Sequence, residues 1–154
     1  MTLNQSISRI MGLWRLGFYK EEELVSWADA TILKMESPSS ELLELSLKGP
    51  SFCAKLQEHE FPSAEEFSFS DRFALKLYKT DLDQEESKKK FVSWVAREAM
   101  GENMKTPEVG FGYQLEHGLS YDEDDPVVYF ENYVHPFLEK SKERTIFLTN
   151  MFNQ

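Results

Sequence analysis

Four consecutive acidic residues, Asp122, Glu123, Asp124 and Asp125, are the side chains in this sequence that most readily suggest chemistry. Carboxylates can bind a divalent cation, but a calcium loop places its oxygen ligands at alternate positions around a central glycine. That pattern does not occur here. Consecutive acids are more typical of a solvated turn at a helix N-terminus, where they complement the helix dipole. We therefore predict no metal site at this run.

The spacing between the histidines and the nearby acids does not match that of a known metal centre. A di-iron bundle uses Glu-x-x-His pairs, whereas Glu131 and His135 are four residues apart and Glu116 and His117 are adjacent. We predict no catalytic residue and no cofactor. A small enzyme or metal-binding protein that uses carboxylates around Glu116 and His117 remains the alternative.

Cys53 is the one cysteine of the chain, so an intramolecular disulfide and a cysteine-based zinc site are both excluded. A nucleophilic cysteine needs a histidine beside it, and nothing in the sequence brings one to this position. A lone cysteine on a short apolar segment is more typical of a small buried hydrophobic side chain. We expect Cys53 to be structural.

The acidic run belongs to a longer window, residues 106–139, which contains eight carboxylates and no Lys or Arg. The whole chain has 27 acidic and 17 basic residues, so the remaining positions hold 19 acids against the same 17 bases. Most of the net charge of -10 therefore lies in one stretch of sequence. Phosphate contacts need Lys and Arg, so this charge disfavours nucleic acid and anionic membranes and favours a basic protein partner.

Tyrosines alternate with the acids of this window, which is typical of an interface with aromatic anchors and a charged rim. Tyr129 and Tyr133 are four residues apart and could equally belong to a helix core. Tyr121 adjoins the acidic run, which favours the interface. The predicted partner-binding residues are Glu108, Glu116, Tyr121, Asp122, Glu123, Asp124, Asp125 and Glu131.

Apolar residues recur at intervals of three and four along most of the chain, which predicts amphipathic helices. The expected helices lie near residues 3–17, 20–36, 37–49, 50–59, 68–78, 83–101 and 126–138. Asp125 followed by Pro126 predicts an N-cap and a first-turn proline, and Pro136 predicts that this last helix kinks or restarts.

Glycines interrupt the pattern in the acidic window. Gly110, Gly112 and Gly118 would each cost about 1 kcal/mol relative to Ala inside a helix, so we expect irregular backbone there. The sequence thus predicts an all-α, single-domain irregular bundle of about six to eight helices, with a loop-rich segment near 106–125.

The size and composition are those of one domain spanning residues 1–154. Hydrophobic residues make up 41% of the chain, which is enough for one core. The N-terminus shows no basic segment followed by an apolar one, and no apolar run approaches the roughly 20 residues of a membrane span. We expect a cytoplasmic protein, and the sequence does not set its oligomeric state.

The segment Trp27-Ala28-Asp29, followed by Ile32, Pro38 and the run Leu42-Leu43-Glu44-Leu45-Ser46-Leu47, resembles small helical bacterial proteins, some of which are grouped with toxin-immunity proteins. The resemblance covers residues 27–47 and implies a cytoplasmic antidote that binds and occludes a cognate toxin domain, often a basic nuclease. It carries no functional residue, and we expect Trp27 and Asp29 to be structural, with Asp29 holding a helix junction.

These observations favour a binding protein over an enzyme. We expect an immunity-type inhibitor that neutralises a basic toxin, for example a nuclease, through its acidic surface. The alternatives are the small enzyme or metal-binding protein described above, and a structural or oligomerising helical protein.

Overall fold

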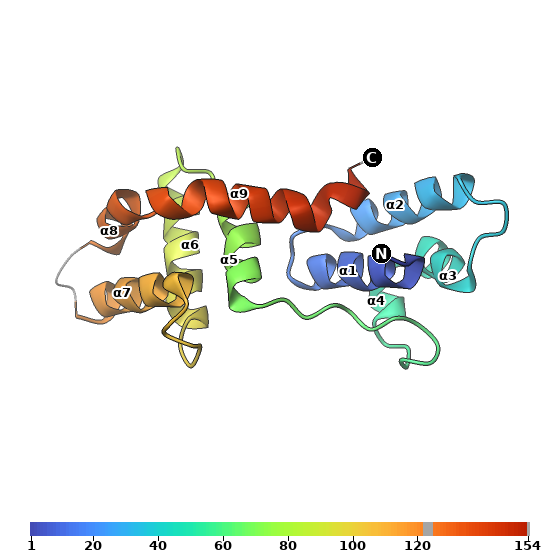
Figure 1. The fold of residues 1–154 in the computed structure, drawn as a ribbon, viewed down its shortest axis with the longest axis horizontal. Helices are drawn as coiled ribbons and strands as arrows, with labels where there is room; N and C mark the ends of the chain where they lie inside the picture. Colours follow the sequence, from blue (N-terminus) through green and yellow to red (C-terminus); the bar gives the residue numbers. More distant parts are fainter. Residues whose placement is uncertain (122–124, 154) are drawn as a thin grey trace. The chain divides into compact units, whose positions relative to one another are not determined.

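A computed structural model describes residues 1–121 and 125–153, and within these residues the regular structure is entirely helical (Figure 1). The all-α prediction is confirmed. The described part of the chain contains nine α-helices and one short 3₁₀ helix, one α-helix more than the upper figure expected from the sequence. None of the helices described is long and apolar enough to cross a membrane.

The chain forms two compact units, and the first is built from two separate stretches, Met1–Glu66 and Asn150–Gln154. Its helices are α1 (Leu3–Arg15), α2 (Glu21–Leu33), α3 (Ser40–Lys48), α4 (Pro50–Cys53) and η1 (Asn150–Phe152). Ile7, Ile10 and Met11 share one face of α1 and are fully buried, and α2 packs against α3. As expected, Asp29 holds a helix junction, because it accepts a hydrogen bond on α2 from the Ser46 hydroxyl on α3.

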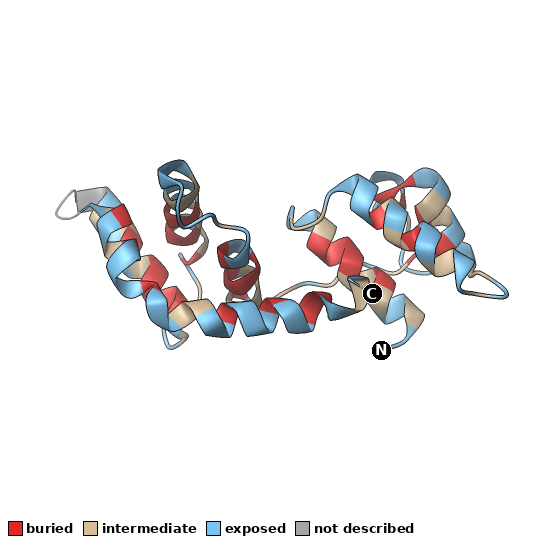
Figure 2. Ribbon diagram, turned by 90° about the horizontal axis from the view of Figure 1, so that it is seen from above, coloured by how far each residue is buried: buried red, intermediate tan, exposed pale blue. Residues whose placement is uncertain are grey.

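The second unit is the continuous stretch Phe67–Thr149. Its helices are α5 (Phe69–Tyr78), α6 (Glu85–Glu98), α7 (Pro107–Tyr121), α8 (Pro126–Tyr133) and α9 (His135–Thr149). Phe73 lies at the centre of its core, with ring centroids of Phe91 and Phe137 both 5.3 Å away. Figure 2 shows the buried residues as separate bands along these helices, which is the result expected of amphipathic sequences.

The loop-rich segment expected near 106–125 is wrong where the structure describes it, because α7 runs as a helix from Pro107 to Tyr121. The reason is close packing at Gly112. A Cβ atom on this glycine would lie 2.5 Å from the Ala99 Cβ and 3.0 Å from the Val95 carbonyl oxygen. Without that atom, α7 approaches the C-terminal end of α6 closely, and the burial gained there offsets the poor helix propensity of glycine.

The helix boundaries predicted after the acidic run are confirmed. Asp125 is the N-cap of α8 and accepts a hydrogen bond of 2.9 Å from the Val127 backbone N–H, with Pro126 at the first helical position. The helix restarts before Pro136, since α8 ends at Tyr133 and α9 begins at His135. The single domain over residues 1–154 stays a prediction.

Candidate functional site

Glu108, the first acid of the predicted interface, is buried inside the second unit. Only 5% of the residue is exposed, and its Oε1 atom lies 3.4 Å from the Nζ atom of Lys140 on α9. The Ser70 hydroxyl donates a hydrogen bond of 3.3 Å to the other carboxylate oxygen. Glu108 therefore links α7 to α5 and α9 and does not present its charge to a partner.

Glu131 is also paired within its own unit. The ammonium group of Lys88 on α6 lies 2.6 Å from the Glu131 Oε1 atom. This hydrogen bond is the main reason why the pKa of Lys88 is raised above its ordinary value. The positive charge of Lys88 thus neutralises much of the field that Glu131 would otherwise present to a partner.

The remaining predicted residues give no contiguous face in the described part of the chain. Glu116 is half-buried in the middle of α7, and Asp125 uses its carboxylate to cap α8. Tyr121 is the last residue of α7, and its side chain is not described. Asp122, Glu123 and Asp124 lie outside the described residues.

The sequence left open whether tyrosines of residues 106–139 belong to a helix core or to an interface, and in the structure they differ in burial. Tyr129 packs against the core of the second unit, 6.0 Å from the Phe111 ring, and burial raises its pKa. The ring of Tyr133 lies 4.6 Å from that of Tyr129, but the residue is 55% exposed. Tyr113 also packs on the core and accepts a hydrogen bond from the Gly101 N–H.

The excess of negative charge is shared equally between the two units. The second unit has 16 acidic and 11 basic residues, and the first has 11 acidic and 6 basic residues, so each carries a net charge of -5. In the second unit, Lys and Arg from α5, α6 and α9 pair with many of the acids. Residues 106–139 therefore account for less of the unpaired negative charge in the folded protein than the sequence suggests.

Unpaired acids are found instead at the first turn of α2. Glu21, Glu22 and Glu23 are all exposed, and none of them forms an ion pair within residues 1–121 and 125–153. Their charges complement the positive end of the helix dipole, which explains why the helix begins here. Glu23 also accepts a 3.1 Å hydrogen bond from the Lys20 backbone N–H, which completes the helix cap.

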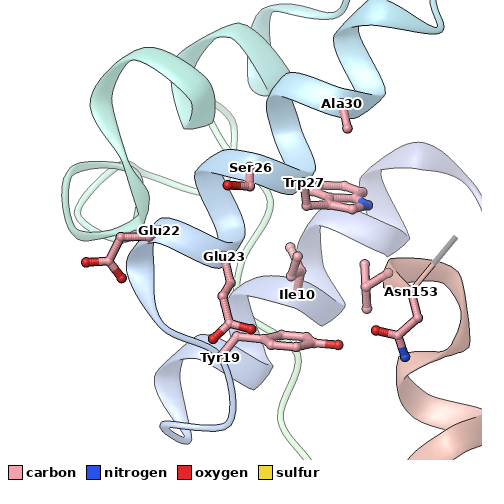
Figure 3. A pocket seen from close by; sticks show the side chains of 9 residues that line it. Ile10, Tyr19, Glu22, Glu23, Ser26, Trp27, Ala30 and Asn153 are labelled. Carbon is pink, nitrogen blue, oxygen red and sulfur yellow. The ribbon is translucent and has the colours of Figure 1, made fainter.

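Beside these acids the first unit has an open pocket of about 390 Å³ (Figure 3). Three half-buried aromatic residues line it: Tyr19 before α2, Trp27 on α2 and Phe152 on η1. The Phe152 ring meets the Trp27 ring at 5.4 Å and 81°, and the Tyr19 ring at 6.1 Å and 86°. Phe152 thus stands nearly perpendicular to the other two rings.

The polar groups of this pocket come from α2 and from the residue after η1. In Figure 3 the Glu23 carboxylate lies beside the Tyr19 ring, while Glu22 points further outward. The Asn153 side chain is directed toward Tyr19 from the other end of the pocket. The pocket therefore combines aromatic surface with carboxylate and amide oxygens, a combination that suits a cationic ligand.

The second unit has a cleft of about 400 Å³ between α5, α7 and α9, and four of the charged side chains that line it form two ion pairs. Arg144 donates two hydrogen bonds to Asp71, of 2.6 and 3.1 Å, and Lys140 pairs with Glu108 as described above. Among the residues that the structure describes, no group of three or more His, Cys, Asp or Glu side chains is placed to hold a metal.

Cys53 is buried in the core of the first unit, as expected from the sequence. Burial, together with the nearby charge of Glu44, raises the pKa of its thiol to about 11. The thiol is therefore protonated near neutral pH, which is unfavourable for a nucleophile.

The aromatic pocket was not predicted from the sequence. Phe152 is more than 120 residues from both Tyr19 and Trp27 in the sequence, so no local pattern connects it with them. The Glu21–Glu23 run lies at the start of the helix predicted near residues 20–36. A local signal was present, however, because helical spacing of four places Glu23 and Trp27 on the same side of α2.

Searches against protein-family models, curated proteins and solved structures gave no match for this chain.

Proposed function

We propose that this protein binds a basic protein partner through the acidic, aromatic face around α2, in the manner of an immunity-type inhibitor that occludes a toxin domain. One observation carries the proposal. Exposed, unpaired carboxylates at Glu22 and Glu23 adjoin a pocket lined by Tyr19, Trp27 and Phe152.

The two kinds of side chain would have different roles in such a complex. Unpaired exposed carboxylates attract a positively charged protein over distances up to the Debye length, about 8 to 10 Å at physiological salt, and so raise the association rate. Half-buried aromatic rings supply apolar area that is desolvated at the centre of an interface and slows dissociation. Because Glu108 and Glu131 already pair with lysines, they are left out of the proposed binding surface.

The proposal is tested with a basic protein that co-purifies with the chain, is identified, and is then prepared in pure form. The double variant Glu22→Lys/Glu23→Lys should lower its association rate about tenfold at low salt, and the difference should shrink as salt is added. Stopped-flow measurement at several salt concentrations provides both quantities.

The matched control is Asp122→Lys/Glu123→Lys, which makes the same change of charge in the acidic window of the sequence. We expect it to have the smaller effect on the association rate. If no purified basic protein binds at low salt, or if the α2 variant associates as fast as the wild type, the proposal is wrong. A larger effect of the control would return the interface to residues 106–139.

A further inference from the structure

The pocket beside α2 has the shape and the charge of a site for one positively charged side chain. The rings of Trp27 and Tyr19 each meet the Phe152 ring nearly perpendicularly. In Figure 3, Trp27 and Tyr19 line the pocket on either side of Ile10. Ile10, which is 1% exposed, closes the pocket on the core side. A ligand that enters would therefore contact apolar surface along its length and carboxylate at its charged end.

We propose that this pocket takes an arginine side chain of the partner, with its guanidinium group against Trp27 and Tyr19 and its N–H groups donating to Glu23. This inference rests on the proposed function, since it names the group by which a basic partner is recognised. It adds a defined site and a defined residue type to what would otherwise be a diffuse attraction between charges.

The polar atoms of the pocket favour a cation with several donors. Glu23 uses its Oε1 atom to accept the Lys20 N–H, and its Oε2 atom remains an acceptor for a ligand. Asn153 places an amide, with a further acceptor oxygen, at the other end. Glu22 adds a second negative charge at the rim.

These features select arginine over the other classes of side chain. An acidic side chain would be repelled by Glu22 and Glu23, and an apolar one would leave the carboxylate of Glu23 without a new donor. A lysine ammonium can make a cation–π contact, but it is compact and strongly hydrated. The planar guanidinium group stacks on aromatic faces and offers five N–H donors in a fixed fork.

The direct test uses small molecules and the whole chain. N-acetyl-arginine methylamide is titrated into the ¹⁵N-labelled protein, and the indole N–H signal of Trp27 is followed by NMR. We expect saturable shifts with a dissociation constant on the order of millimolar, as is usual for one side chain. The citrulline analogue has nearly the same shape without the charge and should bind at least about tenfold more weakly. Equal binding of the two compounds, or no shift with either, would overturn the inference.

Two variants with the same change of charge separate the pocket from its surroundings. Glu23→Gln keeps an oxygen that can accept the Lys20 N–H, so the helix cap is retained, and it should weaken binding of the arginine compound about tenfold. Glu21→Gln lies on the same turn but does not line the pocket, and should change binding less than about twofold. Circular dichroism of both variants checks that α2 is intact. Equal losses in the two variants would show general electrostatics and no site.

Failure of this inference can be distinguished from failure of the proposed function. If a purified basic protein binds the wild type and Tyr19→Leu equally well and shows the expected salt dependence, the proposed function stands and the arginine site is wrong. If the arginine compound binds the pocket and no basic protein binds the chain, the site stands as a guanidinium pocket and the proposed function is wrong.

Discussion

Burial determines the chemistry of Cys53. The residue is 1% exposed, and the pKa of its thiol is raised from 9.0 to about 11, mainly by desolvation. The thiolate fraction at pH 8 is then about a hundredfold lower than for an unperturbed thiol. We expect the native protein to react with a disulfide reagent at least about a hundredfold more slowly than after unfolding in guanidinium chloride, as followed by absorbance. Equal rates in the two states would contradict this.

The same shift predicts how stability depends on pH. The pKa of Cys53 is raised in the folded state, so its contribution to stability is fully present below pH 9 and is lost as pH rises toward 11. The free energy of unfolding of the wild type should therefore fall over this range by roughly 2 kcal/mol more than that of Cys53→Ala. Denaturant titrations of both proteins at pH 8, 9, 10 and 11 measure the difference, and parallel curves would exclude it.

Single residues were predictable from the sequence where their role is local. The cap made by Asp125 requires only the two residues that follow it, and the apolar segment around Cys53 already indicated burial. Glu108 was misplaced on the surface because its partners, Ser70 and Lys140, are 38 and 32 residues away in the sequence. Lys140 lies beside Glu108 only in the folded protein, and this ion pair keeps the Glu108 carboxylate out of an interface.

Two glycines of α7, Gly110 and Gly112, should have opposite effects on stability when each is replaced by alanine. Gly112→Ala places a Cβ atom 2.5 Å from the Ala99 Cβ, so α6 and α7 must separate, and we expect a loss of about 1 to 3 kcal/mol in the free energy of unfolding. Gly110→Ala meets nothing within 4 Å and should gain up to about 1 kcal/mol from its better helix propensity. Chemical denaturation measures both. The same sign for the two variants would show that Gly112 is not a packing position.

This contrast also explains why α7 was expected to be irregular. Propensity describes the cost of a glycine in an isolated helix, and by that measure residues 110–118 should break the element. Close packing of Gly112 against Val95 and Ala99 offsets this cost, and that packing depends on a second helix, α6. Apolar spacing predicted α1, α2, α3, α5 and α6, and Pro136 predicted the restart at His135. The helix expected over residues 50–59 ends at Cys53, and α9 extends to Thr149, beyond the predicted end near residue 138.

Each of the two units has its own buried core, which leads to a prediction for the whole molecule. Phe73 belongs to the core of the second unit and Ile7 to that of the first. Phe73→Leu, which should cost roughly 1 to 2 kcal/mol, should lower hydrogen-exchange protection in residues 67–149 and leave residues 1–66 nearly unchanged. Ile7→Val should show the reverse pattern. Loss of protection along the whole chain in both variants would support the single domain predicted from the sequence.

The pocket of the candidate site depends on contacts between residues that are far apart in the sequence. The distribution of charge in the sequence predicts an interface in residues 106–139. In the structure, Glu108 and Glu131 of this window pair with lysines, whereas the α2 acids form no ion pair with any residue that the structure describes. The general expectation of an acidic protein that binds a basic partner could be derived from composition. The position of the pocket could not, because Phe152 reaches it from the far end of the chain.

Because the first unit is built from two separate stretches of the chain, the residues of the pocket are synthesised at different times. A ribosome releases Tyr19 and Trp27 early, then the whole of residues 67–149, and only afterwards Phe152 and Asn153. The nascent chain would therefore carry an open, incomplete aromatic site until translation of this stretch is nearly finished. Binding competence would appear only after residues 67–149 have been synthesised and have had time to fold.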